Sequence, residues 1–426
     1  MDEGSGVAGR AQFGALYLTR FAAGFGFATL ATLLPTYINL YDPSGLVLGL
    51  FYTGFTVAQT AAVVPVAWAG DRYDKRTVLL VGLGLSVLAY ASFSLAAGSL
   101  GVVLARGLQG LGATTTGILS LAMVGELAPD DERANRIGRA NAFRLAAGVG
   151  GALSAGYLYQ QYSFDVVYGV LVVLLLVAIV GVAAFVERDS TRVRGNPFAG
   201  LALNERLLTL TSFRAQYSVA VTLVRSWVLV YAGLDALDGG LGYAAFVVAV
   251  LYTAERLTNM LCQPYSGALS DRYGRALFVF LGGGAYGLVA LLVPFTPAIG
   301  ATVGAPTAIP SLAGVSSAFL DLSPAFVPLV VCNGLLGVAD SVREPASMAL
   351  FADEGTDDGG VASSFGIREL VWRPGSVLAP IAAGLLTTGP GIEYVFYLGG
   401  GAALTAVVTF LGVLSWNHGR GALTEW

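Results

Sequence analysis

Charged side chains within long apolar runs are the residues of this chain that could do chemistry. An ionisable group at bilayer depth costs at least about 2.5 kcal/mol, so each one needs a partner or a purpose. We identify nine candidate substrate-binding or coupling residues: Arg20, Arg106, Arg225, Glu255, Asp340, Arg343, Glu344, Glu369 and Arg373. The carboxylates of this set all lie in the second half of the chain.

These carboxylates are the candidates for carrying a coupling proton, because arginine does not titrate. Asp340, Arg343 and Glu344 lie at i, i+3 and i+4, so they share one face of a helix. The group could be a structural salt bridge or a switchable coupling site. Pro345 follows directly and should loosen the helix. We favour Asp340, which lies near the middle of its apolar run, as the coupling residue.

Two further pairs involve the remaining deep carboxylates. Glu369 and Arg373 lie at i and i+4 and are expected to form a local bridge. Glu255 and Arg256 are neighbours whose side chains leave a helix about 100° apart, so they should not face one partner together. Of these two, Glu255 is the weakly favoured cavity residue.

Three arginines complete the set of deep charges. Arg20 and Arg225 lie 205 positions apart in similar contexts, and together they could clamp a carboxylate or phosphate. Alternatively, each could pair with a neighbouring carboxylate. Arg106 could meet a coupling group or form a structural pair. With two cysteines, both in apolar runs, and one histidine, no metal site and no cofactor are expected.

The elements that position these charges are membrane helices. The chain has 426 residues, of which 55% are hydrophobic and 12% charged, whereas soluble domains carry roughly 25% charge. A membrane helix needs about 20 apolar residues. Candidate spans lie at 12–40, 45–70, 77–97, 99–126, 138–160, 164–186, 213–235, 242–268, 276–297, 324–350, 364–388 and 393–416.

Positive charge predicts the orientation of these spans, because cytoplasmic loops are rich in Lys and Arg. The loops without either residue are 41–44, 98, 161–165, 236–241, 298–323 and 389–393. The opposite loops, and with them both termini, should be cytoplasmic, in a multi-pass protein of the plasma membrane. The segment 298–323 is expected to be an ordinary outer loop.

A repeated charged loop indicates an internal duplication. Asp71-Arg72-Tyr73 and Asp271-Arg272-Tyr273 lie 200 positions apart, each after an apolar run. The sequence therefore predicts an N-terminal bundle over 1–186, a cytoplasmic linker over 187–212 and a C-terminal bundle over 213–426.

These loops resemble the pattern Gly-x-Leu-x-Asp-Arg-x-Gly-Arg of the major facilitator superfamily. The second copy matches it fully through Gly267, Leu269, Asp271, Arg272, Gly274 and Arg275. The first copy keeps Asp71, Arg72, Lys75 and Arg76 but has Asp74 in place of a glycine. A second pattern, commonest among proton-coupled members including drug exporters, is matched by Arg106, Gln109, Gly110 and Gly112. The exporters' glycine-proline motif lacks its proline here.

The resemblance implies that these loops form a gate that locks the cytoplasmic side. The gate residues it indicates are Asp71, Arg72, Lys75, Arg76, Glu126, Arg133, Asp271, Arg272, Gly274, Arg275 and Asp353. Ion pairs in partly wet surroundings are worth about 0–1 kcal/mol, which suits a gate that opens in each cycle. The alternative is that the loops only set the topology.

The sequence thus predicts an all-α membrane protein with twelve transmembrane helices in two pseudo-symmetric six-helix bundles. The expected function is secondary active transport of a small solute by alternating access, as a monomeric, proton-coupled exporter of the antiporter type. The arginine excess suggests an alternative, which is uptake or exchange of a small anion. A non-transporting membrane ligand sensor is an alternative of another class. Neither enzymatic activity nor nucleic-acid binding is expected.

Overall fold

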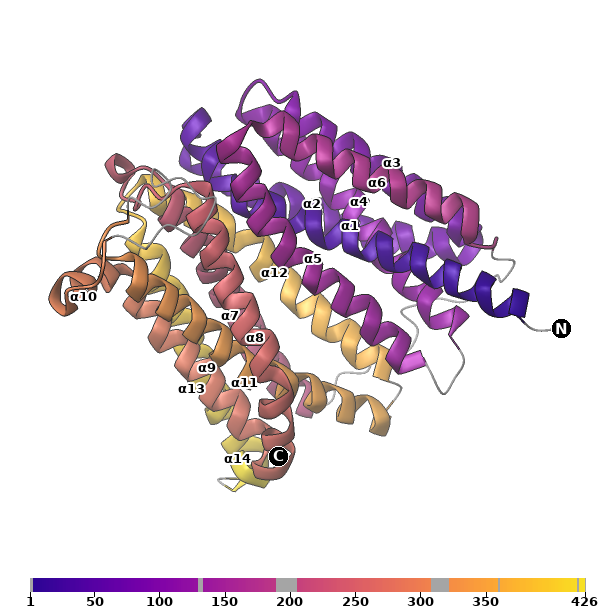
Figure 1. The fold of residues 1–426 in the computed structure, drawn as a ribbon. Helices are drawn as coiled ribbons and strands as arrows, with labels where there is room; N and C mark the ends of the chain where they lie inside the picture. Colours follow the sequence, from indigo (N-terminus) through magenta and orange to yellow (C-terminus); the bar gives the residue numbers. More distant parts are fainter. Residues whose placement is uncertain are drawn as a thin grey trace. The chain divides into compact units, whose positions relative to one another are not determined.

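The computed structural model describes residues 3–128, 133–188, 205–307, 322–358, 361–419 and 421–425. Within these ranges the regular structure is entirely helical (Figure 1). The long helices are α1 (Glu3–Tyr41), α2 (Gly45–Arg72), α3 (Lys75–Ser94), α4 (Ser99–Leu127), α5 (Arg133–Gln161), α6 (Phe164–Phe185), α7 (Glu205–Gly233), α8 (Ala245–Tyr273), α9 (Arg275–Leu292), α11 (Phe326–Asp358), α12 (Val361–Thr388) and α13 (Glu393–His418).

Each of these long helices coincides with one of the expected spans, which confirms the fold class. Nine helices within the described ranges are long and apolar enough to cross a membrane, judged by length and composition. A short helix, α14 (Ala422–Glu425), follows the last long helix, and a 3-10 turn, Ala236–Asp238, lies between α7 and α8.

The segment 298–323 differs from the expected plain loop. After the 3-10 turn Val293–Phe295, helix α10 (Thr296–Val303) occupies the start of this segment. Its first turn holds a proline, which a helix tolerates there because the first backbone N–H groups have no helical partner. Gly304 ends the helix with a φ of 65°. Residues 308–321 lie outside the described part of the chain.

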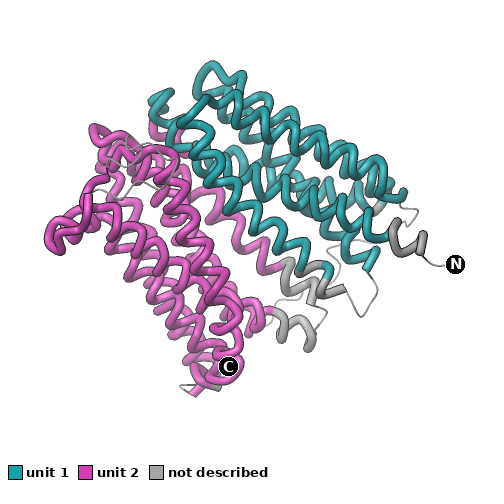
Figure 2. Tube along the Cα trace, viewed as in Figure 1, with its two compact units in different colours: residues 1–43, 50–195 teal, residues 44–49, 196–426 magenta. Residues whose placement is uncertain are grey.

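The chain divides into two compact units (Figure 2). The first contains residues 1–43 and 50–195, and the second contains residues 44–49 and 196–426. In the first unit, α1 packs against α5 and α3 packs against α4. In the second, α8 and α9 both pack against α11, and α7 packs against α13. The expected bundle boundaries remain a prediction, and α7 already begins at Glu205, inside the expected linker.

Glycines allow the close helix contacts that position the buried charges. A Cβ atom at Gly282 of α9 would lie 2.6 Å from the carbonyl oxygen of Ala339 and 2.7 Å from the amide nitrogen of Arg343, both on α11. In the first unit, a Cβ atom at Gly112 of α4 would lie 2.9 Å from the amide nitrogen of Ser86 on α3. Small residues at such crossings are typical of packed membrane helices.

Candidate functional site

One arginine in the second unit joins carboxylates from two other helices. Arg225 of α7 places its Nη2 atom 3.0 Å from Oε1 of Glu255 on α8. The same Nη2 atom lies 2.7 Å from Oδ2 of Asp340 on α11. Three helices far apart in the sequence therefore meet at a single guanidinium group.

Asp340 is the more firmly held of these two carboxylates. Arg343 directs Nε and Nη2 onto its Oδ1 atom at 3.0 and 2.6 Å. The amide of Asn259 donates to its Oδ2 atom at 3.4 Å. The i, i+3 contact expected between Asp340 and Arg343 is therefore present, and hydrogen bonds from two arginines and one amide stabilise the charged carboxylate.

Glu255 is held more loosely. Its Oε2 atom lies 3.2 Å from Nε of Arg256. Its Oε1 atom is within ion-pair distance of Arg225 but makes no hydrogen bond of good geometry. That Glu255 and Arg256 do not face one partner together stays a prediction, since the contact between Oε2 and Nε joins them to each other. Both side chains are long enough to bring their charged groups together although they leave the helix in different directions.

A second charge cluster connects α7 to α12. Arg214 donates from Nε to the backbone carbonyl of Arg368 at 2.6 Å, and its Nη2 atom lies 3.4 Å from Oε1 of Glu369. Arg368 contacts Glu369 at 3.0 Å and Glu344 of α11 at 3.7 Å. The guanidinium of Arg214 also lies 4.6 Å from the centre of the Trp372 ring.

This cluster corrects one expected pairing. The described ion pairs of Glu369 are with Arg214 and Arg368, and the expected bridge to Arg373 is not among them. Glu344 pairs with Arg368 rather than with its neighbour Arg343. Arg368 is itself buried against these partners.

Arg214 is a site residue that the sequence reasoning missed, because it lies at the edge of the expected span. A signal was available in the spacing. Arg214 and Arg225 are eleven positions apart, about three helical turns, so they lie on the same face of α7.

The two clusters line one cavity of about 180 Å³ in the second unit. Its walls come from α7, α11 and α12, and the lining residues are Arg214, Val221, Arg225, Asp340, Arg343, Glu344, Arg368, Glu369 and Trp372. Such a concave site with convergent polar groups is where a small solute is expected to bind.

The deep arginines of the first unit have neutral partners among the described residues. Arg20 donates to the carbonyl oxygen of Gly117 at 3.2 Å and to Oδ1 of Asn141 at 2.9 Å. Arg225, its sequence counterpart, contacts two carboxylates. The two arginines thus occupy similar places in the sequence, but Arg20 contacts neutral groups and Arg225 contacts carboxylates.

Arg106 lies in a network of neutral groups. It donates to the carbonyl oxygen of Phe51 at 2.7 Å and to Oε1 of Gln109 at 2.6 Å. Its guanidinium lies 4.7 Å from the centre of the Phe55 ring. Gln109 in turn donates to the hydroxyl of Tyr90 at 3.0 Å. The described contacts therefore give Arg106 a structural setting.

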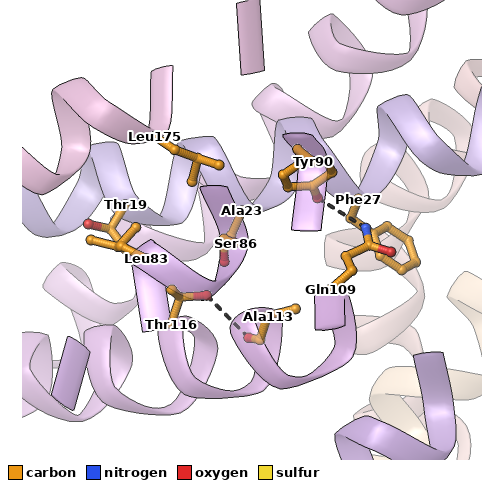
Figure 3. A pocket seen from close by; sticks show the side chains of 10 residues that line it. All are labelled: Thr19, Ala23, Phe27, Leu83, Ser86, Tyr90, Gln109, Ala113, Thr116 and Leu175. Carbon is orange, nitrogen blue, oxygen red and sulfur yellow. Dashed lines mark hydrogen bonds between the residues drawn. The ribbon is translucent and has the colours of Figure 1, made fainter. Parts of the chain in front are cut away.

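Next to this network is a small cavity of about 20 Å³ (Figure 3). Hydroxyl and amide groups of Thr19, Ser86, Tyr90, Gln109 and Thr116 line part of its wall. A cavity of this size holds about one water molecule. The first unit therefore offers no room for a solute at this position, in contrast to the cavity of the second unit.

The first charged loop contains one ion pair and one helix cap. Nζ of Lys75, a buried residue, lies 3.1 Å from Oε1 of Glu126. Asp74 precedes α3 and accepts hydrogen bonds from the backbone N–H of Arg76 at 3.3 Å and from the hydroxyl of Thr77 at 2.7 Å. An aspartate in this N-cap position stabilises the start of a helix. The aspartate that replaces the usual glycine thus has a local structural role.

The other side chains of this gate have separate surroundings. Arg72 lies over the Trp68 ring at 5.0 Å, and Arg76 donates to the carbonyl oxygen of Ala183. The side chains of three expected gate residues, Asp71, Arg133 and Asp353, lie outside the described part of the structure.

The second charged loop is closed by an i, i+4 pair. Nη2 of Arg275 lies 2.8 Å from Oδ1 of Asp271, and Arg272 stacks on the ring of Tyr273 at 5.3 Å. Gly274 between them has a φ of 104°. A Cβ atom there would lie 2.6 Å from the carbonyl oxygen of Thr424 in α14. Both observations require glycine at this position.

The sequence pattern of the Major Facilitator Superfamily matches residues 16–320. The chain belongs to this superfamily. It is therefore a multi-pass membrane transporter and not an enzyme, as the sequence predicted. This match supports the superfamily, but it does not support the narrower resemblance of the Arg106 segment to drug exporters.

Solved transporter structures share the fold at low sequence identity. The nucleoside transporter NupG has a TM-score of 0.74 and 12% identity, covering 94% of this chain and 99% of its own. A POT family transporter in complex with 5-aminolevulinic acid has a TM-score of 0.68 and 12% identity, covering 95% of each chain. A POT family transporter with a thioalcohol-conjugated peptide has a TM-score of 0.66 and 13% identity, covering 95% of each chain. No curated protein matches the chain.

Proposed function

We propose that this transporter moves a small solute by alternating access and couples the movement to protons through the carboxylates that share Arg225. The observation that carries this proposal is the pair of short contacts from one Nη2 atom to Glu255 and to Asp340. Protonation of either carboxylate breaks one contact and leaves the other. A proton can thus change how α7 is tied to α8 and α11.

Glu255 is the better proton carrier on geometric grounds. If Asp340 is protonated, the contacts from Arg225, Arg343 and Asn259 all weaken. If Glu255 is protonated, Arg225 keeps its hydrogen bond to Asp340 and only two ion pairs are lost. The geometry therefore favours Glu255 over Asp340, which the sequence had favoured.

The direction of transport is part of the proposal. The pattern through Arg106 and Gln109 supports proton-coupled export, and the Lys and Arg residues of the loops support cytoplasmic termini. We propose that the transporter works as a monomer in the plasma membrane. The charged loops that hold the pairs Lys75–Glu126 and Asp271–Arg275 would then form the cytoplasmic gate. Partly exposed pairs of this kind are weak, about 0–1 kcal/mol each, so the gate can open in each cycle.

Anion uptake or exchange is the second candidate. Within the described part of the second unit, the two clusters hold five arginines and four carboxylates. This leaves one positive charge without a carboxylate of its own, and an anionic solute group would balance it.

The test is transport by the purified protein in liposomes with an imposed pH gradient. Proton movement, reported by a dye inside the vesicles, should accompany solute movement in the unchanged protein and should be lost in Glu255→Gln. Glu187→Gln, at an exposed glutamate outside the charge clusters, is the matched control. If the rate of solute flux does not change with the imposed pH gradient, the proposal of proton coupling is wrong. Solute binding without any flux would favour the sensor.

A further inference from the structure

We propose that the cavity of the second unit binds a small zwitterion, with its carboxylate at Arg225 and its ammonium group at Glu344 and Glu369. This inference rests on the proposed function, since it names the solute class for that site. The argument starts from the exposed fraction of each charged side chain that lines the cavity.

At one end of the cavity the accessible charge is positive. The Arg225 side chain is 30% exposed, whereas its partners Glu255 and Asp340 are 8% and 1% exposed. Its described ion pairs and hydrogen bonds all use Nη2, and its Nε atom is buried, so Nη1 is the nitrogen left for a ligand. A solute carboxylate is the group that a guanidinium binds best in such a setting.

The net charge at this end agrees with that assignment. Arg225, Arg256 and Arg343 face two carboxylates in the described contacts, so one positive charge is left over. An uncompensated charge in a low-dielectric interior is costly. A ligand with one carboxylate would neutralise this end.

At the other end the accessible charge is negative. Glu369 and Glu344 are 52% and 33% exposed, whereas the arginines that hold them, Arg214 and Arg368, are buried. All four side chains line the cavity, and the two carboxylates are the more exposed of them. Each ionised carboxylate accepts several hydrogen bonds, so capacity remains for an ammonium group.

The cavity volume suits a compact solute. About 180 Å³ corresponds to roughly six water molecules at about 30 Å³ each. A simple anion would bind Arg225 but would make no contact of opposite charge with Glu344 and Glu369, which Arg214 and Arg368 already pair. A simple cation would leave the excess positive charge at Arg225. A solute with both charges makes a charge-assisted contact at both ends of the cavity.

The first experiment compares three probes that share a four-carbon chain on the full-length purified protein: 4-aminobutyrate, butyrate and butylamine. Affinity is measured by ligand-dependent thermal stabilisation. The zwitterion should bind at least about tenfold more tightly than either analogue, since each loses one charge-assisted contact. Equal binding of butyrate would overturn the proposal in favour of an anion site. Equal binding of butylamine, or no binding of glycine, β-alanine or 4-aminobutyrate, would also overturn it.

The second experiment uses Glu369→Gln, with Glu187→Gln as its control. The variant should weaken 4-aminobutyrate binding by about tenfold and leave the weaker butyrate binding unchanged. Its unfolding midpoint without ligand shows whether it folds normally. If the affinities for 4-aminobutyrate and for butyrate fall together, Glu369 has a structural role and the proposed zwitterion site is wrong. If the zwitterion binds but its flux does not depend on the pH gradient, only the proposed proton coupling is refuted.

Discussion

Nη2 of Arg225 lies 2.7 Å from Oδ2 of Asp340, and this contact joins α7 to α11 in the second unit. Asp340 is almost completely buried, and Arg343 holds its other oxygen. The carboxylate is thus the centre of a buried charge cluster, and its removal should affect stability as well as transport.

Asp340→Asn is expected to lower the free energy of unfolding by about 3–5 kcal/mol, because two guanidinium groups then lose their best-held carboxylate. Glu255→Gln, which loses ion pairs without well-formed hydrogen bonds at Oε1, should cost less. Thermal and denaturant unfolding in detergent measure both. Equal losses in the two variants would contradict the unequal roles that we assign.

Gly337→Ala should destabilise the protein, whereas Gly334→Ala should have little effect. Both glycines lie on α11. A Cβ atom at Gly337 would collide with the carbonyl oxygen of Glu255 and the hydroxyl of Thr258, while at Gly334 it would meet only a methyl group of Thr258 at 3.6 Å. Overpacking of this kind costs about 1–3 kcal/mol. Unfolding midpoints check the pair, and equal midpoints would mean that α8 and α11 are not so close.

Lys75 and Glu126 should show a small coupling energy, below about 1 kcal/mol, because the glutamate is half exposed. A double-mutant cycle with Lys75→Met and Glu126→Gln measures it through the unfolding midpoints. The same variants should change transport rate more than stability if the pair acts as a gate. A coupling of several kcal/mol would show a permanent structural bridge instead.

Arg343→Met should destabilise the protein more than Arg106→Met. Removing Arg343 leaves the buried Asp340 with one guanidinium fewer, a loss of about 3–5 kcal/mol. Arg106 has described bonds only to neutral groups, Phe51 and Gln109, so its removal should cost about 1–3 kcal/mol. Denaturant unfolding compares the two variants. The reverse order would indicate that Arg106 has a charged partner beyond the described contacts.

The sequence by itself determined the helices and their repeat. Hydropathy is a local property, so the twelve apolar runs predicted the long helices to within a few residues at most ends. The Asp-Arg-Tyr loops and the pattern at Arg106 indicated the superfamily. The i, i+3 pair of Asp340 and Arg343 was also predictable, because helical spacing alone brings these two side chains together.

Only the tertiary structure decided which deep charges meet between helices. Glu369 pairs with Arg214, 155 positions away, rather than with Arg373, four positions away. Arg20 and Arg225 have similar sequence contexts, yet one contacts neutral groups and the other two carboxylates. The physical reason is that a buried charge takes whatever partner the packing of neighbouring helices places within reach. That packing depends on long-range contacts, which no local pattern contains.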